Sequence, residues 1–237
     1  ATAALQRRAR EAARAYGEGR PGEAARLYEE LIGGGHASVE IFYNLGNAYL
    51  RDGRPGPAVL NYRKAWRLAP RDPDVDANLR AALQASGAAE ADLSSAEIAL
   101  TRLSEREWAA AAALAWWAVC LSLSLALLAP RRRWVCVRAA AAAAAVLALA
   151  ACGLWTWRGF ERDPEVVILG ERQNALSAPL ASSSPRFSLP EGSIVRSRGR
   201  QGEWVRVTHG QLAGWIRRAA CAPVLLEAAT PRPASSS

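Results

Sequence analysis

The stretch IFYNLGNAYLRDGRPGPAVLNYRKAWRLAP, residues 41–70, decides the fold of the N-terminal part of the chain. It contains two runs with helical spacing, separated by the turn residues DGRPG. Gly46 and Ala58 are small where two helices would cross, and Pro70 ends the second run. The residues expected on the buried side are Leu45, Tyr49, Tyr62 and Ala65. The stretch therefore predicts a pair of antiparallel helices.

The same pattern occurs once more upstream at a spacing of 34 residues. GRPGEA at 19–24 becomes GRPGPA at 53–58. Further matches at this spacing are Tyr28 with Tyr62, Asn44 with Asn78, and Leu45 with Leu79. A period of 34 residues is the length of a tetratricopeptide repeat, whose helix pairs bury their faces by stacking on the next pair. Residues 41–70 resemble a near-consensus repeat of that family.

The predicted repeat domain spans residues 1–86, and its two ends depart from the pattern. In the first repeat, near 5–38, Arg8 and Ala12 replace the usual aromatic residue and glycine. Residues 73–86 are expected to form a closing helix. Two repeats and a cap are fewer than the three usually needed for independent stability. We therefore expect the stack to lean on a partner or on the membrane region of the chain.

The resemblance to tetratricopeptide repeats implies a ligand groove on the concave face, which the first helix of each pair forms. Carried over by position, this groove contains Glu40, Tyr43, Asn47, Leu50 and Arg51. The alternative is that these are solvated helix residues, with Asn44 in a capping or polar-ladder role.

Two uncharged segments in the middle of the chain predict a transmembrane hairpin. A linker and juxtamembrane segment at 87–107 ends on Ser104-Glu105-Arg106-Glu107, which fits a capping box. Residues 108–129 then form an uncharged run of 22, enough helix to cross a hydrocarbon core of about 30 Å. The run 139–157 is rich in Ala and is marginal as a lone span, but its small side chains favour close packing on the first. A buried soluble helix is the alternative for this second run.

The connection at 130–138 predicts the orientation of the hairpin. It carries four arginines, which the positive-inside rule places in the cytoplasm: Arg131, Arg132, Arg133 and Arg138. Both terminal domains then lie outside the cytoplasm, in the periplasm of a bacterium with two membranes. The sequence contains no Met, for which a removed signal peptide is one explanation and a shortened chain another.

After the second span the pattern changes to short alternating runs, which predict a small all-β domain at 164–226. The expected strands are Val166 to Leu169, Ser193 to Arg196, Trp204 to Val207 and Gly214 to Ile216. The pieces NALSAP (174–179), FSLPEGSIV (187–195), EWVRV (203–207) and GQLAGWI (210–216) resemble bacterial SH3-like domains. The remaining residues, 227–237, are rich in Pro, Ser and Ala and are expected to be disordered.

The SH3-like resemblance implies a ligand face built from aromatic residues, here Phe187, Trp204 and Trp215. We expect both tryptophans mainly to fill the barrel, and the alternative is that Trp204 presents its ring to a ligand. A basic rim could attract an anionic partner, although a solvated strand edge is the preferred interpretation. The rim consists of Arg196, Arg198, Arg200 and Arg206.

Nucleic-acid binding, metal binding and catalysis find little support in the residues. The net charge is +8, but the densest basic run lies between the two apolar segments, where topology explains it. The four cysteines have no metal-site spacing, and the two histidines, His36 and His209, lie near no plausible nucleophile. We expect no enzymatic activity, no cofactor and no metal.

The order of the parts is more specific than any one of them. Repeats, a span pair with an arginine-rich connection and an SH3-like barrel together resemble the BatE-type proteins of bacterial aerotolerance operons. That resemblance implies a scaffold acting with von Willebrand factor A-domain membrane proteins and a MoxR-type AAA+ ATPase at the inner membrane. The main alternative is a membrane protein that binds peptidoglycan through its SH3-like domain. A signal-transducing receptor is disfavoured, because the connection leaves no cytoplasmic output domain.

Overall fold

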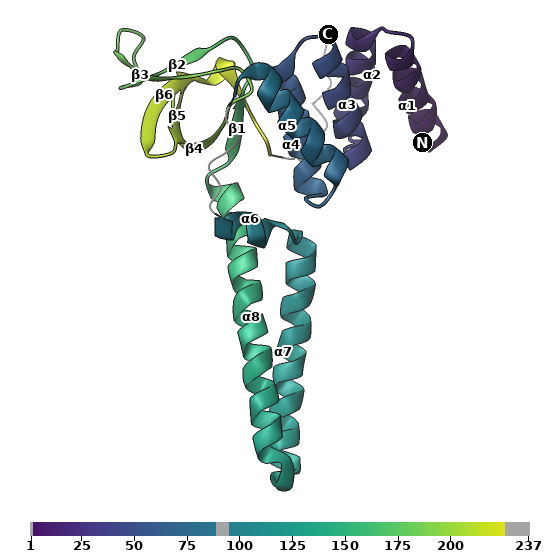
Figure 1. Ribbon diagram of the computed structural model, residues 1–237, viewed down its shortest axis with the longest axis vertical. Helices are drawn as coiled ribbons and strands as arrows, with labels where there is room; N and C mark the ends of the chain where they lie inside the picture. Colours follow the sequence, from purple (N-terminus) through teal and green to yellow (C-terminus); the bar gives the residue numbers. More distant parts are fainter. Residues whose placement is uncertain (1, 89–94, 226–237) are drawn as a thin grey trace, which may run out of the picture. The chain divides into compact units, whose positions relative to one another are not determined.

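The computed structural model describes residues 2–88 and 95–225 of the chain (Figure 1). The chain divides into two compact units. One comprises Ala1–Asp92 together with Asp163–Ser237, and the other is Leu93–Arg162. The predicted tail 227–237 lies outside the described residues, as does part of the predicted linker 87–107.

The N-terminal helices pack in chain order, each on the next, as a stack of antiparallel neighbours (Figure 1). They are α1 (Thr2–Gly17), α2 (Pro21–Gly33), α3 (Val39–Arg51), α4 (Pro55–Leu68) and α5 (Pro73–Ser86). A proline starts α2, α4 and α5, where its missing N–H removes no helical hydrogen bond. The Ser38 hydroxyl caps α3, and the Asp72 carboxylate caps α5.

Glycines fix both the turns and the helix crossing of the stack. The two GRPG turns contain Gly19 and Gly53 at φ of 77° and 73°, the left-handed region that only glycine enters without strain. At the crossing of α3 and α4, a Cβ on Gly46 would lie 2.7 Å from ring carbons of Tyr62, so only glycine fits. The predicted helix pair 41–70 is therefore present, and its two helices meet at the predicted small residue.

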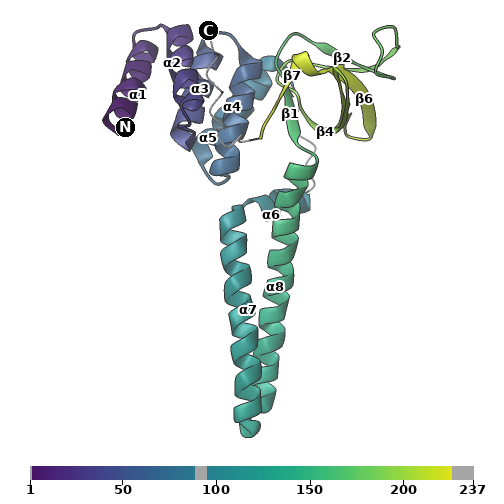
Figure 2. The ribbon, with the colours of Figure 1, turned by 180° about the vertical axis from the view of Figure 1, so that it is seen from behind.

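The C-terminal part forms one antiparallel sheet with the strand order β3-β2-β6-β5-β4-β1-β7. Its strands are β1 (Glu165–Ile168), β2 (Gln173–Leu176), β3 (Pro185–Leu189), β4 (Ile194–Gln201), β5 (Trp204–His209), β6 (Leu212–Arg217) and β7 (Cys221–Pro223). The four expected strands correspond to β1, β4, β5 and β6. The sequence did not predict β2, β3 or β7 as strands. Strand β7 has three residues and lies beside β1 (Figure 2).

Strand β1 is buried on both faces, and this joins the sheet to the helical stack. Val166 and Ile168 pack into the core of the sheet with Val205, Val207 and Ile216, whereas Val167 packs into the core of the helices. Ile194 on β4 and Val224 after β7 join the same helical core. Residues of the C-terminal part therefore complete the core of the helices, while the sheet also has a core of its own.

Polar contacts reinforce the junction between helices and sheet. Arg63 on α4 donates two hydrogen bonds to the Glu165 carboxylate, at 2.8 and 2.7 Å, and their side chains are only 4% and 1% exposed. The Gly56 N–H donates to Glu191 at 3.0 Å. The C-terminal sheet thus stabilises the helical stack. The sequence had instead led us to expect stabilisation by a partner or by the membrane region.

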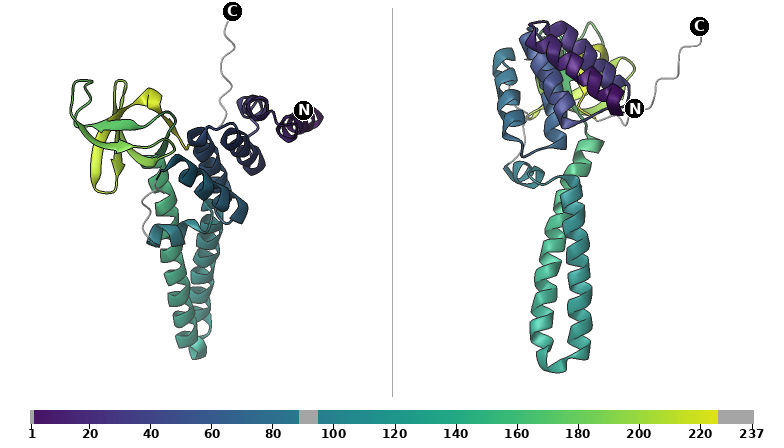
Figure 3. Two further views of the ribbon diagram at one scale, coloured as in Figure 1. Left: turned by 45° about the horizontal axis from the view of Figure 1, so that its top comes forward. Right: turned by 90° about the vertical axis from the view of Figure 1, so that its right-hand side faces the viewer.

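The second unit is a helical hairpin (Figure 3). It contains α6 (Ser95–Thr101), α7 (Glu105–Leu128), the short 3₁₀ turn η1 (Pro130–Arg132) and α8 (Arg133–Arg162). The capping box of Ser104 and Glu107 forms at the start of α7 as predicted. The connection is shorter than the predicted 130–138, because Arg133 and Arg138 already belong to α8.

Two described helices, Glu105–Leu128 and Arg133–Gly159, are long and apolar enough to cross a membrane, as expected. Large apolar side chains along them are exposed, for example Leu127 at 85% and Trp117 at 72%.

Trp108 stabilises one end of the hairpin through two contacts. Trp108 Nε1 donates to the Leu100 carbonyl at 2.8 Å, and its ring fits so closely against Gly153 that a Cβ there would lie 2.3 Å away.

Candidate functional site

Two of the predicted groove residues hold the helices together. The Tyr62 hydroxyl on α4 donates to Asn47 Oδ1 at 2.7 Å. The Asn78 amide on α5 donates to the Tyr43 hydroxyl at 2.8 Å and to Asn47 Oδ1 at 3.2 Å. Burial raises the pKa of Tyr62 well above its ordinary value, so its hydroxyl stays a donor. Tyr43 and Asn47 therefore link α3 to α4 and α5.

The other three predicted groove residues divide by position on α3. Arg51, at its C-terminal end, donates to the Tyr16 carbonyl at 3.0 Å, and its guanidinium lies 5.0 Å from the Tyr16 ring centroid. Leu50 is half-buried against the helical core. Glu40, at the N-terminal end, is exposed. Of the five residues, Glu40 and the accessible part of Tyr43 remain for a ligand.

A hollow of about 180 Å³ lies where the N-terminal ends of α3 and α5 meet. Its lining combines three carboxylates, two valines and an aromatic ring, and it contains no basic residue. The lining residues are Val39, Glu40, Tyr43, Asn44, Asp72, Asp74 and Val75. Hydrogen bonds from its own backbone N–H and from the Ser38 hydroxyl lower the pKa of Glu40. The hollow is therefore negatively charged at neutral pH.

Sequence reasoning missed the two aspartates of this hollow. The Asp72-Pro73 pair signals a helix start, and Asp72 indeed accepts from the backbone N–H groups of Asp74 and Val75. Its place beside Glu40 depends on the packing of α5 against α3, for which no local signal exists. Asn44, for which a capping or polar-ladder role was the alternative, lines the hollow.

On the sheet, the two predicted tryptophans lie outside the core. Along β5, Val205 and Val207 are buried in the inner face, so the alternating residues Trp204 and Arg206 lie on the outer face. In the register of β5 and β6, Trp204 is opposite Arg217 and Arg206 is opposite Trp215. Valine and isoleucine fill the interior instead, which differs from the expected filling role of the tryptophans.

Phe187, the third predicted aromatic residue, lies on the other side of the sheet. It is half-buried and packs against the inner core near Ala175 and Gly214. The three aromatic residues of the predicted ligand face are therefore not brought together. Only the tryptophans share a face.

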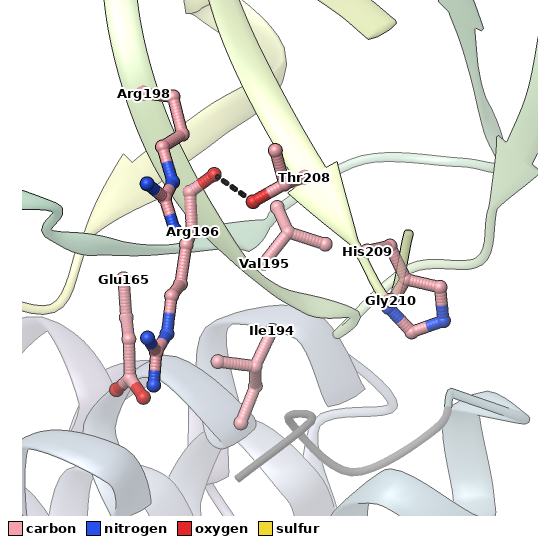
Figure 4. A pocket seen from close by; sticks show the side chains of 8 residues that line it. All are labelled: Glu165, Ile194, Val195, Arg196, Arg198, Thr208, His209 and Gly210. Atoms are coloured by element: carbon pink, nitrogen blue, oxygen red, sulfur yellow. Dashed lines mark hydrogen bonds between the residues drawn. The ribbon is translucent and has the colours of Figure 1, made fainter. Parts of the chain in front are cut away.

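A second hollow, of about 130 Å³, lies at the predicted basic rim (Figure 4). Its lining residues are Glu165, Ile194, Val195, Arg196, Arg198, Thr208, His209 and Gly210. Figure 4 shows the Arg196 side chain extending toward the Glu165 carboxylate, with His209 on the far side of Ile194. Arg198 forms an ion pair with Asp163 at 3.3 Å. These cations are spread along the hollow and do not converge on one point.

Within residues 2–88 and 95–225, no group of His, Cys, Asp and Glu side chains could hold a metal ion. All four cysteines are free thiols. Comparison of the chain with protein-family models, with curated proteins and with solved structures finds no match. The function is therefore inferred from the residues themselves.

Proposed function

We propose that the chain is a membrane-anchored scaffold of the bacterial envelope that holds a segment of a partner protein on its helical stack. The acidic hollow between α3 and α5 carries this proposal. A Lys or Arg side chain of a partner would lay its apolar stem against Tyr43 and Val39 and bring its charged end to Glu40 and Asp74. The role is binding and not catalysis.

The order of the parts supports the family and the partners that we propose. The 34-residue repeat, the two GRPG turns and the helix stack support a tetratricopeptide domain. The short antiparallel strands support an SH3-like domain, and the two long apolar helices support a membrane anchor. A BatE-type protein has these parts in this order. We therefore propose von Willebrand factor A-domain membrane proteins as partners, with a MoxR-type ATPase in the same system.

Neutralising the hollow with Glu40→Gln and Asp74→Asn together should weaken capture of the partner about five- to thirtyfold. Each partly exposed charge contact contributes roughly 0.5 to 1 kcal/mol, and the two substitutions leave the capping residues Ser38 and Asp72 in place. Tyr43 and Asn47 are poor choices for this test, because their removal would loosen the stack. Capture is measured by quantitative pull-down from detergent-solubilised membranes.

The matched control removes two acidic charges from the stack outside the hollow, with Glu11→Gln and Asp52→Asn. Both residues are exposed. This control should retain the partner, and circular dichroism should show that both variants fold equally. Equal retention by the hollow variant and the control contradicts the hollow as a binding site. If Trp204→Ala alone abolishes sedimentation with cell walls while capture of membrane proteins is absent, the peptidoglycan-binding alternative is favoured.

We also propose that both ends of the chain lie outside the cytoplasm, since Arg131, Arg132 and Arg133 lie at the connection between the two apolar helices. Cys221 is a slow probe of this topology, because burial raises the pKa of its half-buried thiol. A better probe is Gln211→Cys, at the exposed turn between β5 and β6, in a chain whose native cysteines are replaced by serine.

An impermeant thiol reagent should label Gln211→Cys in cells whose outer barrier is opened, without lysis of the inner membrane. Ala129→Cys, at the connection between α7 and α8, should be labelled only after lysis. The reverse pattern would contradict the orientation. Labelling of the unfolded chain provides the reference for both positions.

A further inference from the structure

The outer face of β5 and β6 carries a cluster of alternating tryptophans and arginines, Trp204, Arg206, Trp215 and Arg217, termed here the Trp–Arg patch. Each tryptophan lies opposite an arginine on the neighbouring strand. The Arg217 guanidinium lies 5.7 Å from the Trp204 ring centroid. Both arginines are exposed, both tryptophans are half-exposed, and neither strand contains an acidic residue.

The patch is the uncovered part of a face that the helical stack covers elsewhere. Val167 on β1 faces the helices and pairs with Ile194 on β4, which also packs into the helical core. On the same face, Arg196 of β4 pairs with Thr208 of β5, and Trp204 and Arg206 follow Thr208 at a period of two. The helices thus bury one edge of this face and leave the β5–β6 part open.

The chemistry of the patch matches the headgroup region of a bilayer. Tryptophan has an apolar ring with one polar N–H, and it is enriched where lipid meets water. The planar guanidinium of arginine binds phosphate groups through two parallel hydrogen bonds. An anionic surface with an apolar layer beneath it satisfies both kinds of side chain.

The chain itself keeps the sheet near such a surface. Helix α8, whose apolar part reaches Gly159, ends at Arg162, and β1 begins at Glu165. Two intervening residues span roughly 10 Å at most. If α8 crosses a bilayer, this short link raises the effective concentration of lipid headgroups around the sheet. We propose that the Trp–Arg patch binds a bilayer surface that contains anionic phospholipids. The inference rests on the membrane anchoring proposed above.

The test uses the full chain reconstituted in nanodiscs, with the native cysteines replaced by serine. A donor fluorophore is attached at Gln201→Cys, an exposed position on β4 opposite Trp204, and the acceptor is carried on lipid. Energy transfer should be higher in discs with about 30% phosphatidylglycerol than in pure phosphatidylcholine, and it should fall toward the phosphatidylcholine value at about 1 M salt.

Removing the two arginines with Arg206→Gln and Arg217→Gln should shift the equilibrium about 25-fold from the bound toward the free patch. Each arginine contributes about fivefold to binding near an anionic surface. The matched control, Arg7→Gln and Arg10→Gln, removes two exposed arginines from α1 and should behave like the wild type. Equal circular dichroism of the variants excludes unfolding as the cause.

Two outcomes separate the failure of the patch from the failure of the anchor. Flotation with pure phosphatidylcholine vesicles tests the anchor, and a chain that does not float overturns both proposals. A chain that floats, but whose energy transfer is independent of lipid charge, overturns the patch alone. In that case, loss of sedimentation with cell walls in the Arg206 and Arg217 variant would assign the patch to an anionic wall polymer.

Discussion

Replacing Glu165 by alanine should lower the free energy of unfolding of the unit that contains the stack and the sheet by about 3 to 5 kcal/mol. The substitution removes the carboxylate that accepts both hydrogen bonds from Arg63. The Arg63 guanidinium would then remain in an environment where its side chain is 4% exposed. A buried charge without its partner costs far more than the loss of a surface ion pair.

The position of the pair predicts that helices and sheet respond together. Glu165 lies on β1 and Arg63 on α4, so the pair joins the sheet to the helices. Denaturant unfolding gives the loss of stability, and hydrogen exchange read on peptides from α4 and β4 shows where protection is lost. Both peptides should lose protection equally. Loss confined to the β4 peptide would contradict the shared unit.

Two further variants calibrate this measurement. Arg198→Ala breaks the partly exposed ion pair with Asp163 and should cost less than about 1 kcal/mol. The double substitution Arg63→Met and Glu165→Leu removes both buried charges and should recover most of the stability lost in Glu165→Ala, because packed apolar groups can replace a buried ion pair.

The same pair makes the unit sensitive to acid. Burial disfavours the charged form of Glu165, but the charge and hydrogen bonds of Arg63, with Arg67 and Arg196 nearby, outweigh it and lower its pKa. A lowered folded pKa contributes stability that is fully present above the unfolded value of about 4.3 and is lost as pH falls through the folded pKa. Acid unfolding of Glu165→Gln should therefore depend less on pH than that of the wild type.

The helices could be predicted from the sequence because their signals are local. The spacing of Gly46, Ala58 and Tyr62 marks a helix crossing, and the structure places Gly46 against the Tyr62 ring. The segment 73–86 coincides with α5, and the capping box of Ser104 forms at α7. Each of these features depends on residues within one helix or within two consecutive helices.

The junction and the outer face could not be predicted, because they depend on distant pairing. Arg63 and Glu165 are separated by 102 residues, and Arg63 alone looks like a solvated helix position. One signal was present in the sequence. The three apolar residues of EVVI at β1 are consecutive and do not alternate with polar residues, as expected for a strand buried on both faces. The outer position of Trp204 and Trp215 follows from the burial of the alternating residues in the inner core, and their closeness follows from the register of β5 and β6.

The crossing of α3 and α4 predicts the effect of replacing Gly46 by leucine. A Cβ at this position would lie 2.7 Å from two ring carbons of Tyr62. That ring cannot move aside, because Tyr62 is fully buried and its hydroxyl donates to Asn47 at 2.7 Å. Overpacking of this kind costs about 3 kcal/mol or more when neither helix can shift. Gly46→Leu should therefore unfold the helical stack.

The sheet should lose protection in the same transition, although it lies more than 100 residues further along the chain, because Val167, Ile194 and Val224 complete the core of the helices. Thermal unfolding and hydrogen exchange of the full chain measure both effects. Gly33→Leu is the matched control, since Gly33 is exposed at the end of α2 and a Cβ added there would meet no atom within 4 Å, and it should melt like the wild type. Unchanged melting of Gly46→Leu would show that α3 and α4 cross elsewhere, and loss of protection in the helices alone would show that the sheet folds independently of them.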